Sequence, residues 1–306
     1  MHGRRNVLTL LAAGLGVFAV SALAQEGPKE KPKVVATFSI LADLAKNVGG
    51  DRVEVSSLVG PDGDAHVYAP TPADGRRLAD AALVVANGLK LEGWMGRLIR
   101  SSGTKARIVE AAKGVLPIKA EEHGHDHGGH AEVNPHAWQS VANAKIYVAN
   151  IRDGLIAADP AGKASYEANA AAYLARLDEL DAEIRAAVGR IPRDRRKIIT
   201  SHDAFGYFQK AYGIAFVAPQ GVSTEAEASA KDVGRIIQQI RRERIPAVFL
   251  ETITDPRLAE RIAKESGAKV GGRLYSDALS APDGPAGTYI DMMRHNIRAL
   301  GAALSS

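Results

Sequence analysis

Short apolar runs alternate along the chain with longer stretches in which apolar residues recur every three or four positions. The runs lie at 34–40, 53–59, 83–87 and 107–109, and again at 197–200, 214–217, 247–251 and 268–270. Runs of this length are typical of buried strands, whereas the wider spacing is typical of amphipathic helices. Strands that alternate with helices predict an α/β fold with mainly parallel sheets.

The helical spacing predicts helices at 41–48, 71–81, 135–157, 161–189, 203–212, 230–243, 255–266 and 288–304. In the helix at 161–189, apolar positions repeat in one continuous seam from Tyr166 to Val188. About 28 helical residues span roughly 42 Å, which is longer than one small lobe needs. We therefore predict an N-terminal lobe at 33–158, a linking helix at 159–190 and a C-terminal lobe at 191–306.

The N-terminus has the pattern of an export signal. Arg4 and Arg5 precede an apolar run at 7–20, and small residues at 22–24 form a cleavage site before Gln25. We predict a signal peptide at 1–24 that is cleaved after Ala24, by either the general or the twin-arginine route. A disordered lead-in follows at 25–32.

The composition restricts the class of protein further. The chain has no cysteine, which excludes disulfides, thiolate metal sites and a lipid-modified N-terminal cysteine. An exported chain without an anchor is expected in a bacterial periplasm. The 39 basic and 35 acidic side chains are interspersed, so no nucleic-acid partner is expected.

The nine histidines suggest metal chemistry. His66, His136 and His202 lie in three separate turn-prone segments, and His66 and His202 each follow a predicted strand. In α/β sheets ligands bind beyond the carboxyl ends of the strands. Asp277 follows the strand near residue 270, so three imidazoles and one carboxylate could form a four-coordinate zinc site. Each residue alone could instead be an ordinary turn, capping or core residue, and the spacing does not fix their geometry.

A histidine-rich stretch at 121–132 interrupts the alternation. It mixes four acidic residues with His123, His125, His127 and His130. Such a segment cannot form a packed core, and we expect a loop. It is either an auxiliary, weak zinc site or a solvated tether with incidental affinity for metal.

Four segments together resemble the zinc/manganese-binding component of bacterial ABC importers, and the likeness runs from about residue 33 to the C-terminus. They read GDAHxYxPxP at 63–72, NPHAW at 134–138, SHDAFGYF at 201–208 and GxSTEAE at 221–227. The resemblance implies two lobes joined by a rigid linking helix, with the metal held between them. It assigns one ligand to each of the first three segments, His66, His136 and His202, and a late acidic ligand that maps best to Asp277.

The resemblance also implies a function. It predicts a periplasmic binding protein, without enzymatic activity, that captures Zn²⁺ and delivers it to the membrane permease of an ABC importer. A histidine at 202, where manganese-specific relatives tend to carry glutamate, favours zinc because imidazole suits zinc and oxygen-rich sites suit manganese. We expect a monomer, and a periplasmic metallochaperone is a conceivable second partner.

Alternatives remain open from the residues alone. A Mn²⁺ carrier on the same fold is the nearest, followed by a metal-buffering or adhesin-like protein. A zinc hydrolase would use the three histidines with Asp277 or Glu251 as general base, but the chain has neither an HExxH pair nor a GxSxG elbow. Glu225 or Glu227 is a candidate for orienting a ligand, and His295 is expected to be structural.

Overall fold

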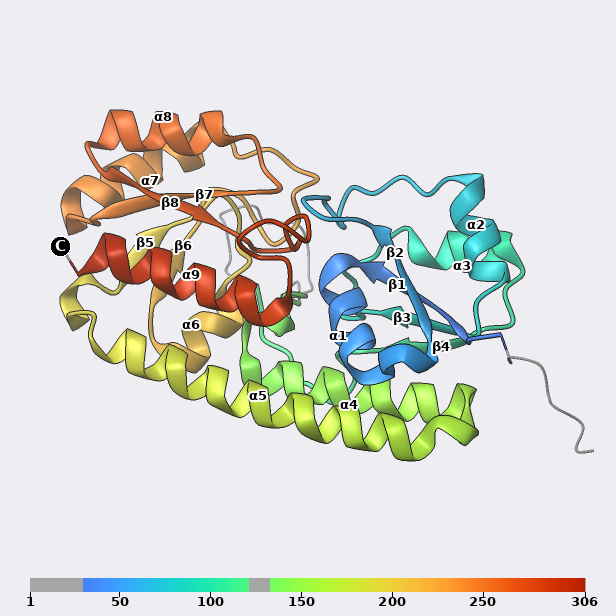
Figure 1. The fold of residues 1–306 in the computed structure, drawn as a ribbon. Coiled ribbons are helices and arrows are strands. Elements are labelled where there is room, and N and C mark those ends of the chain that lie inside the picture. Colours follow the sequence, from blue (N-terminus) through green and yellow to red (C-terminus); the bar gives the residue numbers. More distant parts are fainter. Residues whose placement is uncertain (1–29, 121–132, 306) are drawn as a thin grey trace, which may run out of the picture. The chain divides into compact units, whose positions relative to one another are not determined.

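The computed structural model describes residues 30–120 and 133–305, and residues 31–306 form one compact unit. The predicted signal peptide, most of the predicted lead-in and the histidine-rich stretch lie outside the described residues. The described part contains two four-stranded parallel sheets surrounded by helices (Figure 1). The predicted α/β class with two parallel-sheet lobes is confirmed.

The sheet of the N-terminal lobe has the strand order β2-β1-β3-β4. Its strands are β1 (Lys33–Phe38), β2 (Glu54–Val59), β3 (Leu83–Ala86) and β4 (Arg107–Glu110). Its helices are α1 (Ser39–Gly49), α2 (Pro72–Ala79), α3 (Met95–Ser102) and α4 (Val141–Ala158). The central strands β1 and β3 are almost completely buried, which explains why their sequences are continuously apolar rather than alternating.

The sheet of the C-terminal lobe repeats this arrangement with the order β6-β5-β7-β8. Its strands are β5 (Lys197–Ile199), β6 (Ala215–Val217), β7 (Ala247–Glu251) and β8 (Lys269–Leu274). Its helices are α6 (Gly206–Tyr212), α7 (Ala230–Glu243), α8 (Pro256–Ser266) and α9 (Tyr289–Leu304). Apolar side chains of α7 and α8 form a separate small core with β5 and β7.

The long helix α5 (Lys163–Gly189) contacts elements of both lobes (Figure 1). Near its start, Asn169 donates a hydrogen bond to the carbonyl of Val48 in α1. Near its end, Glu183 pairs with Arg294 of α9. Its buried positions are those of the predicted seam, namely Tyr166, Ala170, Tyr173, Leu177, Leu180, Ile184 and Val188. The lobe boundaries at 158 and 190 remain a proposal; they fall next to the ends of α4 and α5.

The helix predicted at 135–157 begins later than expected. Residues Ala137–Gln139 form a separate 3₁₀ turn, and α4 starts at Val141. Asn134 does not cap a helix, because its side-chain oxygen accepts hydrogen bonds from the backbone and the ring of His136. The predicted helix therefore starts six residues too early.

Two further differences are local. The strand predicted at 34–40 ends at Phe38, and Ser39 already opens α1. The two-turn helix α3 was not predicted, because its only buried residues are Met95 and Leu98, too few to produce a periodic pattern. It ends at Gly103, whose φ of 63° is the left-handed conformation that glycine tolerates best.

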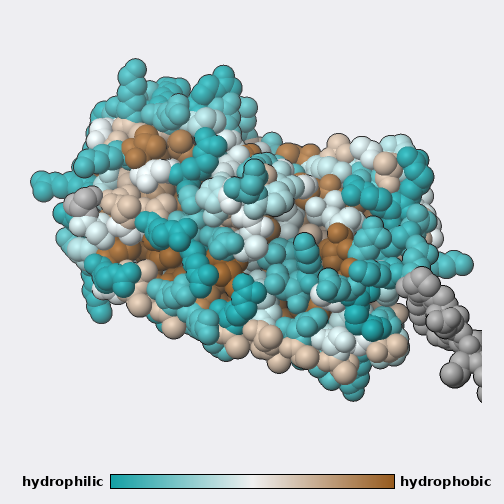
Figure 2. Space-filling view, in the orientation of Figure 1, coloured by the Kyte–Doolittle hydropathy of each residue, from teal (hydrophilic) through white to brown (hydrophobic). Residues whose placement is uncertain are grey.

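The surface is mainly hydrophilic in the view of Figure 2, with apolar residues scattered over it. The large apolar side chains exposed within the described residues are Val67, Ile108, Leu116 and Val270. None of the helices in the described part has the length and apolar character needed to cross a membrane.

Candidate metal centre

Four side chains from both lobes converge on one point. His66 follows β2, His136 precedes the 3₁₀ turn Ala137–Gln139, His202 follows β5 and Asp277 follows β8. One nitrogen or oxygen atom from each of the four lies within 4.8 Å of the corresponding atom of every other. The structure therefore brings together all four residues that the sequence analysis singled out, including Asp277.

The donor atoms of these four side chains lie close together. Nε2 of His66 lies 3.2 Å from Nε2 of His136 and 3.0 Å from Oδ2 of Asp277. Nε2 of His202 lies 3.4 Å from Nε2 of His136 and 3.3 Å from the same carboxylate oxygen. Nε2 of His136 is 3.4 Å from Oδ2 of Asp277. The three Nε2 atoms and one carboxylate oxygen thus all face a common centre.

The centre is withdrawn from solvent. The side chains of His136, His202 and Asp277 have no exposed surface, and that of His66 is only 4% exposed. Oδ1 of Asp277 is buried and has no hydrogen-bond partner within the described residues. An unpaired carboxylate oxygen in such surroundings is costly, and a bound cation would remove that cost.

The loop that carries His136 is fixed from two sides. Oδ1 of Asn134 lies 2.9 Å from Nδ1 of His136, which leaves Nε2 to face the centre. Beyond it, the side chains of Trp138 and Gln139 both donate hydrogen bonds to the carbonyl of Ser276, at 2.9 and 2.7 Å. Ser276 precedes Asp277, so these bonds also fix the position of the carboxylate.

The loop that carries His66 is held by a contact from the other lobe. Oδ1 of Asp64 accepts a hydrogen bond from the backbone N–H of His66 at 2.8 Å. Oδ2 of the same carboxylate accepts one from the hydroxyl of Thr224 at 2.6 Å. Thr224 lies in the segment GxSTEAE, whose role the sequence left open. That segment reaches the centre through Thr224, whereas Glu225 and Glu227 are exposed, and within the described residues neither side chain contacts a proposed ligand.

The loop that carries His202 is supported by a buried glutamate. Oε2 of Glu251, at the end of β7, lies 2.6 Å from Nδ1 of His202. Oε1 of Glu251 accepts hydrogen bonds from the backbone N–H groups of Ser201 and His202, at 2.7 and 2.9 Å. A carboxylate in this position directs the Nε2 atom of the imidazole toward a metal. Sequence reasoning considered Glu251 only as the base of a hydrolase.

Burial and charge shift the pKa values of these groups in different directions. Burial lowers the pKa of His136, although Asp277 opposes this effect. Burial also acts to lower the pKa of His202, but Glu251 and Asp277 outweigh it and hold that pKa well above its usual value. For Asp277, burial acts to raise the pKa, yet His136 and His202 hold it well below the usual range. A cation therefore meets an ionised carboxylate and competes with a proton at His202.

His295 lies away from the centre. Its Nε2 is 3.0 Å from the carbonyl oxygen of Arg273, and its ring packs against Tyr275. These contacts are consistent with the structural role expected for it. The histidines at 123, 125, 127 and 130 lie outside the described residues.

Comparison with known proteins agrees with this architecture. Residues 34–303 match the family described as zinc-uptake complex component A, periplasmic. The chain is 37% identical to the iron-binding protein YfeA of Yersinia pestis, over 96% of this chain and 94% of that protein. It is 33% identical to the manganese ABC transporter substrate-binding lipoprotein PsaA of Streptococcus pneumoniae, over 98% of both chains.

A solved structure shows the same fold. The periplasmic zinc-binding protein TroA from Treponema pallidum superposes with a TM-score of 0.84 at 32% sequence identity. The match covers 90% of this chain and 100% of TroA.

The fold and the four-residue centre define a metal-binding, substrate-binding protein of an ABC transporter that works outside the cytoplasm. The chain belongs to the family of periplasmic zinc-uptake component A proteins. Members of this class bind and deliver a metal ion and are not enzymes, so the hydrolase alternative is set aside. Its partner is the membrane permease of the transporter with its ATPase.

Proposed function

We propose that the chain captures Zn²⁺ with His66, His136, His202 and Asp277 and delivers it to the permease of its ABC importer. The observation that carries this proposal is the spacing of the donor atoms. At zinc–ligand distances of about 2.0–2.1 Å, neighbouring ligands in a tetrahedral site are about 3.3 Å apart. The five donor-atom separations described above run from 3.0 to 3.4 Å.

The choice of zinc rests on the ligand chemistry. Three imidazoles and one carboxylate suit zinc, whereas manganese favours sites richer in oxygen. The alternative is a Mn²⁺ carrier on the same fold, since similar proteins are named for manganese, iron and zinc. Because the donor set offers three nitrogens and a tetrahedral spacing, we place zinc first.

The N-terminal sequence supports a proposal about the location of the carrier. We propose that residues 1–24 are removed after Ala24 and that the mature chain is released into the periplasm as a monomer. Several similar proteins are named lipoproteins, but this chain has no cysteine to carry a lipid. A periplasmic metallochaperone as an additional partner stays a proposal without a structural feature that supports it.

We also propose that the stretch 121–132, with His123, His125, His127 and His130, is an auxiliary site that collects zinc weakly. Its four imidazoles and adjacent carboxylates are suitable ligands. The centre described above is formed by His66, His136, His202 and Asp277, all outside this stretch, so removal of the stretch is expected to leave the tight site intact.

The test is the amount of metal that remains bound after exhaustive dialysis, measured by elemental analysis. The chain without residues 121–132 is expected to retain a single zinc ion, and His202→Ala in that background is expected to lose it. His295→Ala is the matched control and is expected to retain zinc. Full retention by the His202→Ala variant would refute the ligand assignment.

A competition experiment addresses the choice of metal. His202→Glu converts the donor set to two nitrogens and two oxygens, so the preference for zinc over manganese is expected to decrease. The measurement is the zinc-to-manganese affinity ratio of the variant against the unaltered chain. A ratio that does not change would argue against the role given to His202 in metal selection.

A further inference from the structure

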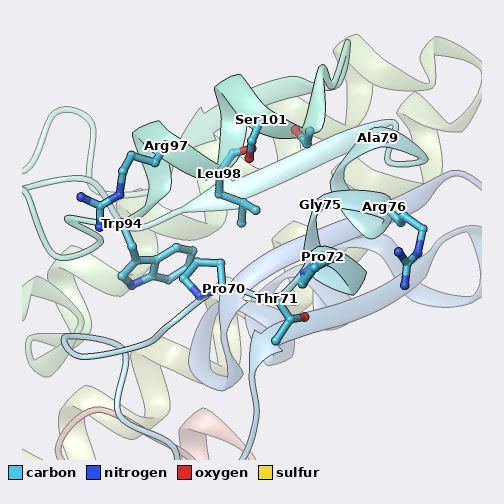
Figure 3. Close-up of a pocket in the computed structure, with 11 residues that line it drawn as sticks. Pro70, Thr71, Pro72, Gly75, Arg76, Ala79, Trp94, Arg97, Leu98 and Ser101 are labelled. Atoms are coloured by element: carbon cyan, nitrogen blue, oxygen red, sulfur yellow. The ribbon is translucent and has the colours of Figure 1, made fainter.

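A groove separates α2 from α3 on the surface of the N-terminal lobe (Figure 3). Its volume is about 620 Å³. Its lining includes the proline-containing start of α2, the apolar side chains Trp94 and Leu98, and the hydroxyl-bearing residues Thr71, Ser101 and Ser102. No residue of the metal centre lines this groove.

Gly75 is one of the residues that line the groove. It lies in the middle of α2, where glycine costs about 1 kcal/mol relative to alanine. Its φ is not positive, so the backbone does not require glycine. A Cβ atom placed on it would meet nothing within 4 Å, so packing does not require glycine either. What the missing side chain provides is space in the groove, and Ala79 one turn later is also small.

The groove carries two exposed arginines. Figure 3 shows Arg97 and Arg76 toward opposite ends of the lining, with Leu98 and Pro72 between them. Across residues 30–120 and 133–305, neither guanidinium has an ion pair or a hydrogen bond. The neighbouring Arg77 differs, because it pairs with Asp74 and donates to the carbonyl of Ser57. The unpaired charges fit an acidic occupant.

The wall of the groove touches the loop that carries His66. Nε1 of Trp94 donates a 2.8 Å hydrogen bond to the carbonyl of Ala65, the residue before His66. The ring of Tyr68 packs on that of Trp94 with centroids 5.1 Å apart. A segment bound against Trp94 would therefore lie against a side chain that supports one of the proposed ligands.

We propose that the α2–α3 groove docks an extended acidic segment on the extracytoplasmic face of the transporter's membrane permease. This inference rests on the proposed function, which supplies that partner. Two arginines at separate positions along an apolar floor suit a short peptide with spaced carboxylates, in which side chains fill the space above Gly75. The docked segment would lie against Trp94, whose hydrogen bond to Ala65 supports the loop that carries His66. It would therefore contact that loop only when the loop holds this hydrogen bond.

The test uses the zinc-loaded mature carrier, including residues 121–132, and its own permease–ATPase complex in lipid nanodiscs. The measurement is the carrier concentration that gives half-maximal stimulation of ATP hydrolysis. Gly75→Trp fills the groove, and Arg76→Glu combined with Arg97→Glu reverses its charge without adding bulk. Both variants are expected to raise the half-maximal concentration at least tenfold.

Matched controls lie on the C-terminal lobe. Gly234→Trp places the same side chain on another helical glycine, in α7, where a Cβ would also meet nothing within 4 Å. Arg298→Glu reverses an exposed arginine of α9. Both controls are expected to stimulate the complex as the unaltered carrier does. Thermal melting verifies that each variant is folded, and the two groove variants test the same surface in independent ways.

The outcomes separate this inference from the function on which it rests. Zinc binding is measured for every variant, and the groove variants are expected to retain it. If the unaltered carrier binds zinc and stimulates the complex but both groove variants do so equally well, the docking proposal is overturned. If the unaltered carrier binds no zinc or fails to stimulate the complex, the proposed function fails and the docking proposal falls with it. The docking proposal is also overturned if the groove mediates dimerisation. Sedimentation would then show a dimer for the unaltered carrier and a monomer for the groove variants.

Discussion

The imidazoles of His136 and His202 are held by different acceptors. His136 faces the neutral amide oxygen of Asn134, whereas His202 faces the carboxylate of Glu251. Asp277 and Glu251 together carry two negative charges next to three imidazoles, which matches the charge of a divalent cation when the imidazoles are neutral. The glutamate therefore contributes charge as well as orientation, although it is not one of the four proposed ligands.

Replacing Glu251 tests that contribution. Glu251→Gln keeps the size of the side chain and an oxygen that can accept the backbone N–H groups, but it removes the charge. Zinc affinity is expected to fall about 10–100-fold, the usual effect of losing a carboxylate behind a metal-bound histidine. The measurement is a competitive titration with a zinc chelator. Glu225→Gln, an exposed residue in the GxSTEAE segment, is the control, and equal affinity in the two variants would contradict the role of Glu251.

At the scale of single residues, the sequence predicted the four converging side chains but not the groups behind them. His66, His136 and His202 could be found because they lie in three of the four recognisable segments, and Asp277 because it is a late acidic residue that follows a predicted strand. Glu251 ends an apolar strand, and its contact with His202 spans 49 residues of sequence. The contact of Thr224 with Asp64 spans 160. Such pairings depend on how strands and loops that are distant in sequence come together in the fold, which local pattern does not encode.

Among the elements, the loop between β6 and α7 reaches from the C-terminal lobe to the N-terminal lobe. It leaves the C-terminal lobe and places the hydroxyl of Thr224 on Asp64, which in turn holds the backbone of His66. A hydrogen bond to a charged acceptor contributes on the order of 1.5–3 kcal/mol. This loop is therefore expected to slow the departure of a bound ion rather than to supply a ligand.

The prediction concerns the rate of metal release. Thr224→Val removes the hydroxyl at nearly constant volume and is expected to speed zinc dissociation about tenfold, in line with the energy of one charge-assisted hydrogen bond. Thr224→Ser keeps the hydroxyl and should release zinc at close to the original rate. Stopped-flow mixing with an excess of chelator gives both rates. Identical rates for the two variants would show that the contact does not retain the ion.

Most elements were predictable because their patterns were strong. The helix at 230–243 and the strand at 247–251 agree with α7 and β7 at both ends. The helix predicted at 135–157 was started too early, since Asn134, a residue type that can cap a helix, instead holds the ring of His136. At this scale, one error occurs where a residue serves the metal centre instead of its own element, and the missed helix α3 reflects an apolar pattern that is too short.

Across the whole molecule, one carboxylate links the two lobes away from the metal. Oδ2 of Asp43 in α1 accepts a 2.9 Å hydrogen bond from the backbone N–H of Tyr289, the first residue of α9. Burial raises the pKa of Asp43 from 3.8 to about 6, although the N–H of Tyr289, the amide of Asn47 and the charge of Arg176 lower it. Asp291 adds a smaller upward effect.

This shift predicts how stability depends on pH. A carboxyl whose pKa is raised on folding contributes stability below pH 3.8, and that contribution is lost as the pH rises through about 6. Its size is about 3 kcal/mol, since each pKa unit corresponds to about 1.4 kcal/mol. Asp43→Asn is expected to remove this dependence, so the variant should gain stability relative to the unaltered chain between pH 4 and pH 7. Urea unfolding of the metal-free proteins across that range provides the measurement.

The exposed carboxylate of Asp283 serves as the control for that experiment. Asp283→Asn is expected to give a pH profile parallel to that of the unaltered chain. If the Asp43→Asn profile were parallel as well, the buried carboxylate would not be the source of the dependence. The variants are compared with the unaltered chain because many other groups titrate in the same pH range. Their contributions to the free energy of unfolding cancel only in the difference between two proteins.

The helix α5 has a consequence for how a loaded carrier is recognised. Seven buried side chains spaced from Tyr166 to Val188 fix it against both lobes, and bending it would separate packed surfaces at several points at once. The lobes are thus poorly suited to a wide swing, and the full and empty states should have nearly the same outline. The permease then cannot distinguish the loaded carrier from the empty one by its outline. The permease must instead respond to the rigidity of loops such as the one that carries His66. Loading is then signalled by rigidity rather than by shape.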